Sequence, residues 1–363
     1  MRICSCQIQG FRNIESASLT FHPRYNIICG DNGQGKTNLM EALWLFTGGR
    51  DFKGNRENDL IRRGEKTAKI SLILETAGGE REMTLTLEKG KRRAYTVGGV
   101  PRASGAEVVG NLYAVVFSPA HLSLLQNGPE ERRKFLDSAI CPVSPTYLRA
   151  LTDYRKVLVQ RNALLKDARI NPEITELLEV FDPQLAKIGS YLIQVRRSYL
   201  ERLMTYAAPF YQGISGGSEA LSAVYLSAAL EAGEKEEAFL QRLRETRDED
   251  LRAMNTSLGP HRDDVEFSID GMESRRFASQ GQQRSVVLAL KLAESRILGD
   301  MTGEPPVILL DDVMSELDAG RKEYLLGGLE QGQIFITGCD PAFFSSFAGA
   351  FFHTENGKFA QVN

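Results

Sequence analysis

The chain has 363 residues, and its 44 Lys and Arg against 47 Asp and Glu give a formal net charge of −3. This size allows about two domains, and the charge excludes a global basic field, although a local basic patch is enough for contacts with nucleic-acid phosphates. No apolar run approaches the roughly 20 residues that span a bilayer, and the first residues lack the features of a signal peptide. The five cysteines, an odd number without a C-x-x-C pair, are typical of reduced thiols. We therefore expect a soluble, cytoplasmic protein that has no membrane segment.

The first third of the chain is rich in strand patterns. Alternating or compact apolar runs predict strands at 3–9, 16–21, 25–29, 68–76, 81–88, 93–97 and 112–117. The runs 68–76 and 81–88 flank Ala77-Gly78-Gly79-Glu80, which predicts a hairpin. Between the strand at 25–29 and a helix expected over 36–47, glycines from Gly30 to Gly35 interrupt the pattern. The order is therefore strand, glycine-rich turn and helix, followed by an antiparallel section.

The middle of the chain, from Pro119 to about 254, has mostly helical spacing. Two apolar stripes are typical of helix packing: Leu148, Leu151, Leu158 and Leu165, and then Leu185, Ile188, Leu192, Val195 and Tyr199. Prolines at 142, 145, 172, 183 and 209 divide the region and exclude one long coiled coil. We expect a compact helical domain over 119–254.

Strands alternate with helices again in the last hundred residues. The pattern predicts strands at 264–269, 306–311 and 333–337, a turn at Asp270-Gly271, and helices at about 281–298 and 320–330. Such alternation is typical of a mostly parallel sheet with helical cover. The sequence therefore predicts one α/β domain, built from 1–118 and 255–363, around the helical insertion.

The most specific motif follows the strand at 25–29. It matches G-x-x-x-x-G-K-[ST] with Gly30, Asp31, Asn32, Gly33, Gln34, Gly35, Lys36 and Thr37. Glycines let backbone N–H groups surround phosphate oxygens, and the positive end of the following helix adds to this attraction. Lys36 is placed for the β- and γ-phosphates and the Thr37 hydroxyl for Mg²⁺. Because the motif lies between a predicted strand and a predicted helix, ATP binding is favoured over a chance glycine turn.

Two carboxylates, Asp311 and Asp312, follow the apolar run 307–310. Ligands of α/β folds bind at the carboxyl ends of the strands, where Asp311 would hold Mg²⁺ and Asp312 would orient and deprotonate the attacking water. Alone, the pattern also describes an ordinary strand-ending turn. The phosphate loop in the same chain favours the catalytic interpretation.

A third motif, Ser279-Gln280-Gly281-Gln282-Gln283-Arg284, directly precedes a predicted helix. A serine and a glycine at a helix start expose N–H groups to an anion, although a simple N-cap has the same pattern. Together with Ser315-Glu316-Leu317-Asp318 after the carboxylates, the motif resembles the ATP-binding-cassette (ABC) superfamily. There, a serine–glycine signature contacts the γ-phosphate bound by the other protomer, and a D-loop follows the acidic strand.

Nearly the whole chain resembles the RecF family of bacterial recombination-repair ATPases, which is related to the heads of SMC proteins. Besides the motifs above, the resemblance rests on Gly10-Phe11-Arg12-Asn13, on Asn38 after the phosphate loop, on Phe117-Ser118-Pro119 and on Gly259-Pro260-His261-Arg262-Asp263-Asp264. It implies an ABC-type P-loop ATPase head with an antiparallel β section and an inserted helical domain. It also implies an ATP-dependent homodimer that binds single-stranded or gapped DNA, hydrolyses ATP weakly under DNA stimulation, and assists RecA loading with RecR and RecO.

Carried over residue by residue, the resemblance assigns nucleotide contacts to the phosphate loop through Asn38. It implies that Ser279, Gln280, Gly281 and Gln282 complete the opposite subunit's site. Two positions depart from the wider superfamily: Asp312 stands where a glutamate is usual, and Thr337 where transporters have a histidine. We expect both departures to make hydrolysis slow, as suits a switch rather than a motor.

Contacts with DNA are expected from short basic clusters, each of which also describes an ordinary solvated surface. The favoured clusters are Arg62-Arg63 and Lys91-Arg92-Arg93; the others are Arg132-Arg133-Lys134 and the group Arg50, Lys53 and Arg56. For His261, a structural role is favoured over a nucleotide contact.

Two other classes of protein compete with the RecF-type interpretation. A transporter ATPase predicts L-S-G-G-Q, a glutamate after Asp311 and a histidine near 337, and none of these is present. An SMC-type structural head needs hundreds of residues of heptads between its motifs, whereas only 241 residues, interrupted by prolines, separate Thr37 from Ser279.

Overall fold

A computed structural model describes residues 1–48, 57–168, 171–329, 332–338 and 348–362. Arg50, Lys53, Arg56 and Cys339 lie outside the described residues. The chain forms two compact units: the first contains 1–123, 213–217 and 284–363, and the second contains 124–212 and 218–283.

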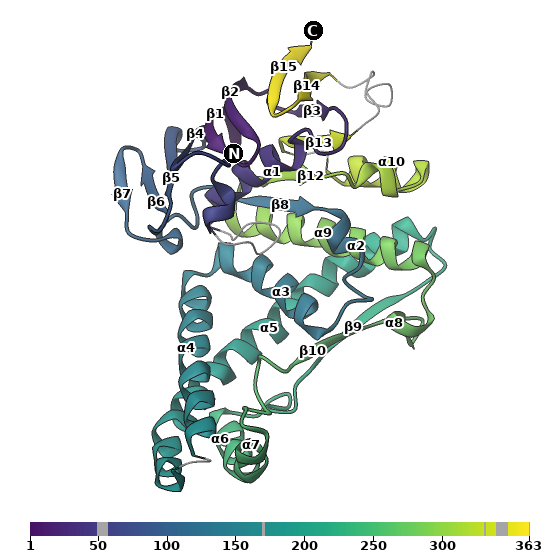
Figure 1. The fold of residues 1–363 in the computed structure, drawn as a ribbon. Coiled ribbons are helices and arrows are strands. Elements are labelled where there is room, and N and C mark those ends of the chain that lie inside the picture. The colour runs from purple at the N-terminus through teal and green to yellow at the C-terminus, as the bar shows by residue number, and fades with distance from the viewer. Residues whose placement is uncertain (49–56, 169–170, 330–331, 339–347, 363) are drawn as a thin grey trace. The chain divides into compact units, whose positions relative to one another are not determined.

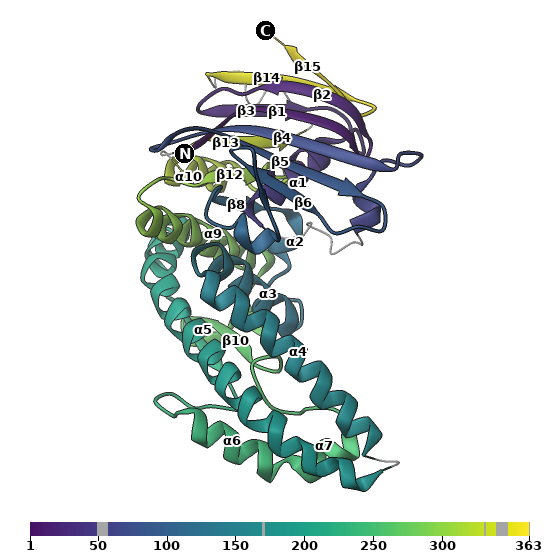
Figure 2. The same ribbon diagram turned by 90° about the vertical axis from the view of Figure 1, so that its left-hand side faces the viewer.

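The first unit contains an antiparallel sheet in the strand order β2-β1-β4-β5-β6-β7 (Figure 2). Its strands are β1 (Arg2–Phe11), β2 (Ile14–Thr20), β4 (Thr67–Thr76), β5 (Gly79–Glu88), β6 (Ala94–Val97) and β7 (Val100–Arg102). Thr76 is paired with Gly79, so the predicted hairpin is confirmed, with a turn of Ala77 and Gly78. Buried side chains alternate with more exposed ones along these strands, because only one face of this sheet meets the core. In β4 the buried side chains are Ala68, Ile70, Leu72 and Leu74.

The second sheet of this unit has the order β15-β14-β3-β13-β12-β8. It contains β3 (Tyr25–Cys29), β8 (Ala114–Phe117), β12 (Val307–Leu310), β13 (Ile334–Gly338), β14 (Gly349–Glu355) and β15 (Lys358–Val362). All neighbouring strands are parallel except β14 and β15. The central strands are almost continuously apolar and buried, as expected of a parallel sheet covered on both faces. The predicted parallel sheet is confirmed, whereas the hairpin of β14 and β15 was not anticipated.

Helix α1 (Lys36–Trp44) lies between these two sheets and contacts both β1 and β13 (Figure 1). Its buried side chains include Leu39, Met40 and Leu43, which join the main apolar core. Buried Gln333, just before β13, also links the sheets, because its amide exchanges two hydrogen bonds with the backbone of Ile3 in β1. The remaining helices of the unit are α2 (Pro119–Leu122), α10 (Ala319–Gly328) and most of α9 (Gln280–Thr302).

The second unit combines helices with a three-stranded sheet. Its elements are α3 (Pro129–Ile140), α4 (Pro145–Asp167), most of α5 (Leu178–Ile214), β9 (Leu221–Leu226), α6 (Glu236–Glu245), α7 (Arg247–Ala253), β10 (Asp264–Ile269), β11 (Met272–Glu273), α8 (Ser274–Phe277) and the start of α9. The sheet has the order β11-β10-β9. Strand β10 agrees with the prediction, but β9 lies in the region that the sequence predicts to be helical.

The pairing of β9 with β10 changes the domain boundary. Because all six residues of β9 are paired with β10, the segment up to Gln283 belongs to the second unit, so the predicted boundary at 254 falls inside it. Pro142, Pro145 and Pro172 lie at the starts of helices and divide the region as expected, whereas Pro183 and Pro209 do not. Both of these prolines lie within the 37-residue helix α5, where buried side chains flank each missing N–H: Leu178 and Leu185 around Pro183, and Ala207 and Tyr211 around Pro209.

Candidate functional site: a phosphate loop beside an acidic strand end

The phosphate loop connects β3 to α1 in the first unit. Gly30, Gly33 and Gly35 have φ angles of 150°, 79° and 114°, which side chains with a Cβ rarely adopt. A Cβ on Gly30 would lie 2.4 Å from the Thr354 carbonyl oxygen, and one on Gly35 would lie 2.8 Å from Asn13 Oδ1. Close packing therefore requires glycine at positions 30 and 35, and the backbone conformation favours glycine at all three. Of the other loop residues, Asp31 and Asn32 are exposed and Gln34 is half-buried.

Lys36 is the first residue of α1 and is only 4% exposed. Its Nζ donates to the carbonyl oxygens of Gly30, at 2.6 Å, and Asp31, at 3.1 Å. The loop thus folds around the ammonium group, which brings a buried positive charge to the start of a helix. An anion is favoured at such a place by both the charge and the helix dipole.

Thr37 and Asp311 lie together, although 273 residues separate them in the chain. The Thr37 hydroxyl donates to Asp311 Oδ1 at 3.0 Å. Strand β12 places Asp311 there because its neighbour β8 accepts the Asp311 N–H at the Phe117 carbonyl oxygen, 2.8 Å away. Burial is the main cause that raises the pKa of Asp311, while the hydrogen bonds from Thr37 and Thr337 act in the opposite direction.

Asp312 has a φ of 52°, a left-handed conformation that is uncommon outside glycine but tolerated by aspartate. Thr337, fully buried in β13, supports this turn. Its Oγ1 accepts the Asp312 N–H at 2.8 Å and donates to Asp311 Oδ1 at 3.0 Å. The threonine at the superfamily's histidine position therefore forms hydrogen bonds with both Asp311 and Asp312.

We expect Thr337→Val to destabilise the protein by about 1–3 kcal/mol, because it leaves the part-buried Asp312 N–H without this acceptor. It should also lower ATP turnover by about tenfold, since Asp311 loses one of the two hydroxyls that orient it. Urea unfolding and a phosphate-release assay measure the two effects. Thr337→Ser keeps the hydroxyl and is the control. A valine variant equal to wild type in both assays would contradict this role.

The turn between β1 and β2 supports the phosphate loop from one side. In the sequence, this segment entered only as part of the family resemblance. Asn38 Nδ2 donates to Asn13 Oδ1 at 2.8 Å, and Asn13 Nδ2 donates to the Gly33 carbonyl oxygen at 3.3 Å. Arg12 binds Glu41 of α1 through two hydrogen bonds of 2.8 and 3.0 Å. The segment Gly10-Phe11-Arg12-Asn13 is therefore a support for the phosphate loop and its helix.

The turn between β14 and β15 supports the loop from another side, and no motif indicated it. The Gln34 carbonyl oxygen accepts from the Gly357 N–H at 2.9 Å and from Thr354 Oγ1 at 3.1 Å. The Gln34 side chain accepts the Asn356 N–H at 2.6 Å. More than 300 residues separate these partners in the chain, so the contact exists only in the folded sheet and has no local sequence pattern.

The Ser279 motif begins α9 in the second unit. The Ser279 N–H donates to Gln282 Oε1 at 2.8 Å, and the Gln282 N–H donates to Ser279 Oγ at 3.2 Å. These reciprocal bonds form a capping box, so the N-cap interpretation holds locally. Ser279 and Gln280 are exposed, and Gly281 is half-buried. Farther along α9, within the first unit, Arg284 binds the Glu316 carbonyl oxygen at 2.7 Å and its carboxylate at 2.9 Å, which ties α9 to the D-loop-like segment.

The basic clusters differ in their accessibility. Arg63, Lys91 and Arg92 are exposed, whereas Arg62 and Arg93 are half-buried. Arg62 pairs with Glu15 at 3.1 Å and Lys91 with Glu88 at 2.9 Å. Both ion pairs are at the surface, where they contribute little to folding stability. Each basic side chain can therefore exchange its carboxylate partner for a phosphate.

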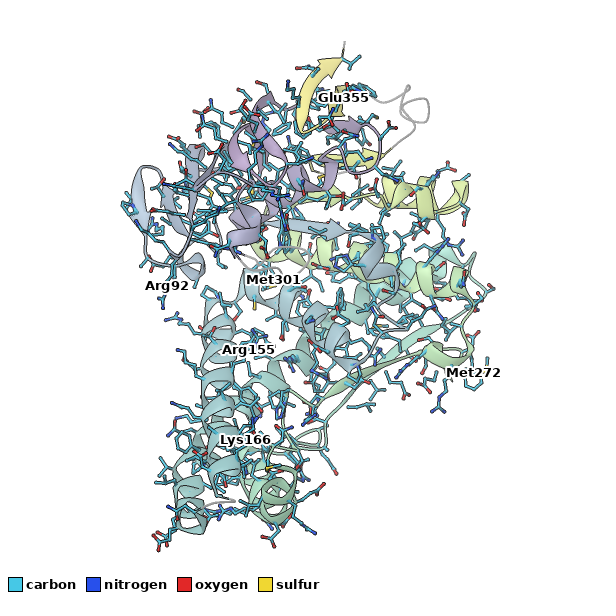
Figure 3. All side chains as sticks on the ribbon, viewed as in Figure 1. Arg92, Arg155, Lys166, Met272, Met301 and Glu355 are labelled. Carbon is cyan, nitrogen blue, oxygen red and sulfur yellow. The ribbon has the colours of Figure 1, made fainter. Side chains whose placement is uncertain are left out.

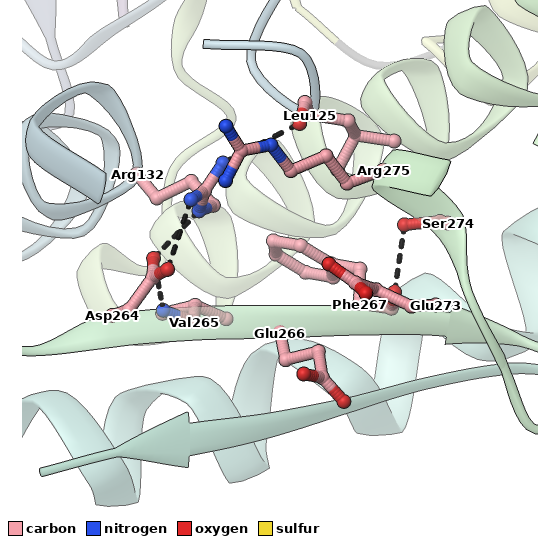
Figure 4. Close-up of a pocket in the computed structure, with 9 residues that line it drawn as sticks. All are labelled: Leu125, Arg132, Asp264, Val265, Glu266, Phe267, Glu273, Ser274 and Arg275. Carbon is pink, nitrogen blue, oxygen red and sulfur yellow. Dashed lines mark hydrogen bonds and ion pairs between the residues drawn. The ribbon is translucent and has the colours of Figure 1, made fainter. Parts of the chain in front are cut away.

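In the cluster Arg132-Arg133-Lys134, Lys134 is exposed, but the two arginines are engaged within the second unit and do not form the expected basic surface. Arg132 is 3% exposed, and its guanidinium binds both carboxylate oxygens of Asp264, at 2.6 and 2.9 Å (Figure 4). Arg133 donates to the Asp263 carbonyl oxygen at 2.6 Å. Both arginines therefore hold the Gly259–Asp264 segment inside the second unit, and an arginine pair in sequence gave no sign of these distant partners.

His261 lies in the same network. One ring nitrogen is 2.8 Å from Tyr154 Oη and the other is 3.1 Å from the Thr256 carbonyl oxygen. Burial lowers the pKa of His261 to about 4, so the ring is neutral at pH 7. These contacts, all within the second unit, favour a structural role.

A small pocket also lies in the second unit, beside Arg132, Asp264 and Phe267 (Figure 4). Its volume of about 30 Å³ suits one or two water molecules rather than a nucleotide. Among the residues that the structure describes, no helix is both long and apolar enough to cross a bilayer.

The first unit's site fits ATP and Mg²⁺ by the chemistry of its donors. A hydroxyl and a carboxylate oxygen 3.0 Å apart are the hard ligands that Mg²⁺ prefers, and Lys36 is the cation that triphosphates require. Within the described ranges no group of three or more His, Cys, Asp or Glu gathers as a metal site.

Comparison with known proteins gives one consistent result. Residues 2–351 match the family described as the RecF/RecN/SMC N terminal domain. The DNA replication and repair protein RecF of Agathobacter rectalis is 40% identical over 337 residues, which cover 93% of this chain and 92% of that protein. The protein of the same name from Gloeobacter violaceus is 38% identical, and the match covers 95% of this chain and 94% of that protein.

Solved structures agree. The recombination mediator protein RecF with ATPrS, described in the RecFOR pathway, superposes with a TM-score of 0.93 at 36% identity and covers 100% of this chain and 98% of that one. RecF with ATP gives the same TM-score. The Smc head of Pyrococcus furiosus, at 16% identity and a TM-score of 0.57, shares the fold alone. This chain therefore belongs to the RecF family, and its fold is the ABC-type ATPase head that RecF shares with SMC proteins.

Proposed function

We propose that this protein is an ATP-dependent DNA-binding protein of recombinational DNA repair and replication. The observation that carries the proposal is the convergence of Lys36, Thr37 and Asp311 at one sheet edge, in a chain that superposes on RecF with ATP at a TM-score of 0.93. In this proposal the protein acts in the cytoplasm with DNA, RecR and RecO, and it assists RecA loading at gaps. The RecFOR pathway of the solved relatives supports those partners.

Nucleotide binding would use the residues in distinct ways. The N–H groups of Gly30 to Gly35 and of Asn38 would donate to phosphate oxygens, and Lys36 would exchange its carbonyl partners for the β- and γ-phosphates. Thr37 and Asp311 would hold Mg²⁺, and the ion would supply positive charge for the transferred phosphoryl group. Asp312 accepts a proton from the attacking water, and Thr337 keeps the Asp312 backbone in place.

Hydrolysis in this proposal is slow. The Asp312 side chain is one methylene shorter than the glutamate usual in the superfamily, and its backbone is confined to the left-handed region, so its reach toward a water is limited. We expect turnover well below the roughly 1–100 per second of kinases. A phosphate-release assay at saturating ATP checks it, with and without gapped DNA. Turnover of tens per second would contradict a slow switch.

The site is completed by a second copy of the chain in this proposal. Exposed Ser279 and Gln280, with Gly281 and Gln282, offer the N-terminal end of α9 to the γ-phosphate bound by the partner. ATP would then join two protomers. The test is sedimentation velocity of Asp312→Asn with ATP or ADP: dimers with ATP alone support the proposal, and monomers in both would remove it.

DNA contact is expected at the turn between β5 and β6, where Lys91 and Arg92 are exposed; Arg92 is labelled in Figure 3. The double variant Lys91→Glu/Arg92→Glu should bind gapped duplex DNA about tenfold more weakly at physiological salt and should lower the salt slope by about two, because two phosphate contacts are lost. Fluorescence anisotropy with ATP at several salt concentrations measures both. Lys166→Glu, an exposed change at the end of α4, is the control. An unchanged slope would exclude this turn and leave Arg62 and Arg63 as the candidates.

A further inference from the structure

A side chain outside all the motifs holds the start of α9. Besides accepting the Ser279 N–H, the Gln282 side chain donates from Nε2 to Glu219 Oε1 at 2.8 Å. Both polar ends of this amide are therefore used, which fixes its rotamer. The Gln282 N–H in turn holds the Ser279 hydroxyl. A chain of hydrogen bonds thus leads from Glu219 through Gln282 to Ser279, entirely within the second unit.

Glu219 is itself held from two directions. Its second carboxylate oxygen accepts from Tyr211 Oη at 2.5 Å, and Tyr211 is fully buried near the end of α5. The next residue, Ala220, exchanges two hydrogen bonds of 2.8 and 2.9 Å with Asp270, in the turn between β10 and β11. The long helix α5 thus fixes the carboxylate and the sheet fixes the neighbouring backbone, so that Gln282 is bound to a rigid partner at an exposed helix terminus.

We propose that Glu219 is a positioning residue for the nucleotide of a second copy: it holds Gln282, and through it the Ser279 hydroxyl, in the orientation in which α9 meets the partner's γ-phosphate. This inference rests on the proposed ATP-dependent dimer. The first turn of a helix lacks internal partners for its N–H groups and frays easily. If that turn is ordered before the dimer forms, less conformational entropy is lost on association.

The chemistry of the pair suits this role. A hydrogen bond to a carboxylate is stronger than one between neutral groups, and a negative charge near a helix N-terminus is favourable. The effect is confined to association, because Lys36, Thr37 and Asp311 belong to the first unit. Loss of Glu219 should therefore weaken dimerisation while each protomer's own affinity for ATP stays the same. A general loss of folding would lower both.

The experiment uses the full chain with Asp312→Asn, which slows hydrolysis. Three further changes are compared in that background: Glu219→Ala, Glu219→Gln and Tyr211→Phe. Sedimentation velocity gives the dimer dissociation constant with ATP, a fluorescent ATP analogue gives the affinity of dilute monomers, and thermal unfolding gives Tm. Glu219→Ala should raise the dimer dissociation constant by about tenfold or more, the equivalent of one hydrogen bond to a charged group, while monomer affinity stays within twofold.

The conservative variants make the outcome specific. Glu219→Gln keeps an acceptor for Gln282 and should dimerise within about threefold of its parent, and Tyr211→Phe should lie between parent and alanine variant. An unchanged dimer constant in Glu219→Ala, or an equal loss of monomer ATP affinity, overturns the role of Glu219. If the parent itself forms no ATP-dependent dimer, the proposed function fails first, and the inference fails at its premise.

Discussion

Lys36→Met is expected to weaken ATP binding by at least about 100-fold. Lys36 is 4% exposed, and its ammonium group binds the carbonyl oxygens of Gly30 and Asp31, so the loop is shaped around a charge that phosphate oxygens would share. Methionine keeps the length of the apolar stem but removes this charge-assisted contact. Isothermal titration with Mg²⁺ and ATP measures the loss directly.

The matched control for this change is Lys89→Met, which removes an exposed lysine just after β5 in the same unit. It should leave ATP affinity unchanged. Thermal unfolding of both variants shows whether the loop still folds, because Lys36 also binds two backbone carbonyl groups. A folded Lys36→Met protein that binds ATP within threefold of wild type would contradict the phosphate-loop assignment.

Asp312→Asn is expected to lower the rate of ATP hydrolysis by about two to three orders of magnitude while ATP binding is retained. Asparagine has the same shape but cannot accept the proton of the attacking water. It also tolerates the left-handed backbone at this position, and Thr337 can still accept its N–H, so the turn should be preserved. Single-turnover hydrolysis measures the rate, and titration with ATP measures binding.

The control for the second change is Asp248→Asn, the same substitution at an exposed position of α7. It should hydrolyse ATP at the wild-type rate. If Asp312→Asn also keeps that rate, the water-activating group lies elsewhere, and Asp311 together with the partner's signature would remain as candidates. If ATP binding is lost as well, the residue serves the nucleotide rather than the water.

Local patterns were enough where the physics is local. Apolar strands such as 307–310 and helices such as α1 follow from the period of their side chains, and they were predicted within a few residues. Strand β9 was missed because its sequence, LSAVYL, lies among helical patterns, and its pairing with β10 decides its conformation. The helical path through Pro183 and Pro209 was missed for a similar reason, since burial along α5 outweighs two absent N–H donors.

By itself, the sequence determined the α/β fold class and the phosphate loop, because a glycine turn between strand and helix is a property of a few neighbouring residues. It also indicated Asp311 and Asp312 as the acidic strand end. Only the tertiary structure decided which distant groups support them: Thr337 beneath the carboxylates, the β14–β15 turn behind Gln34, and Glu219 beside Gln282. The tertiary structure likewise showed that Arg132 binds Asp264 and is not part of a basic surface. A hydrogen bond between residues tens or hundreds of positions apart has no local pattern, since it exists only once sheets and helices have closed around it.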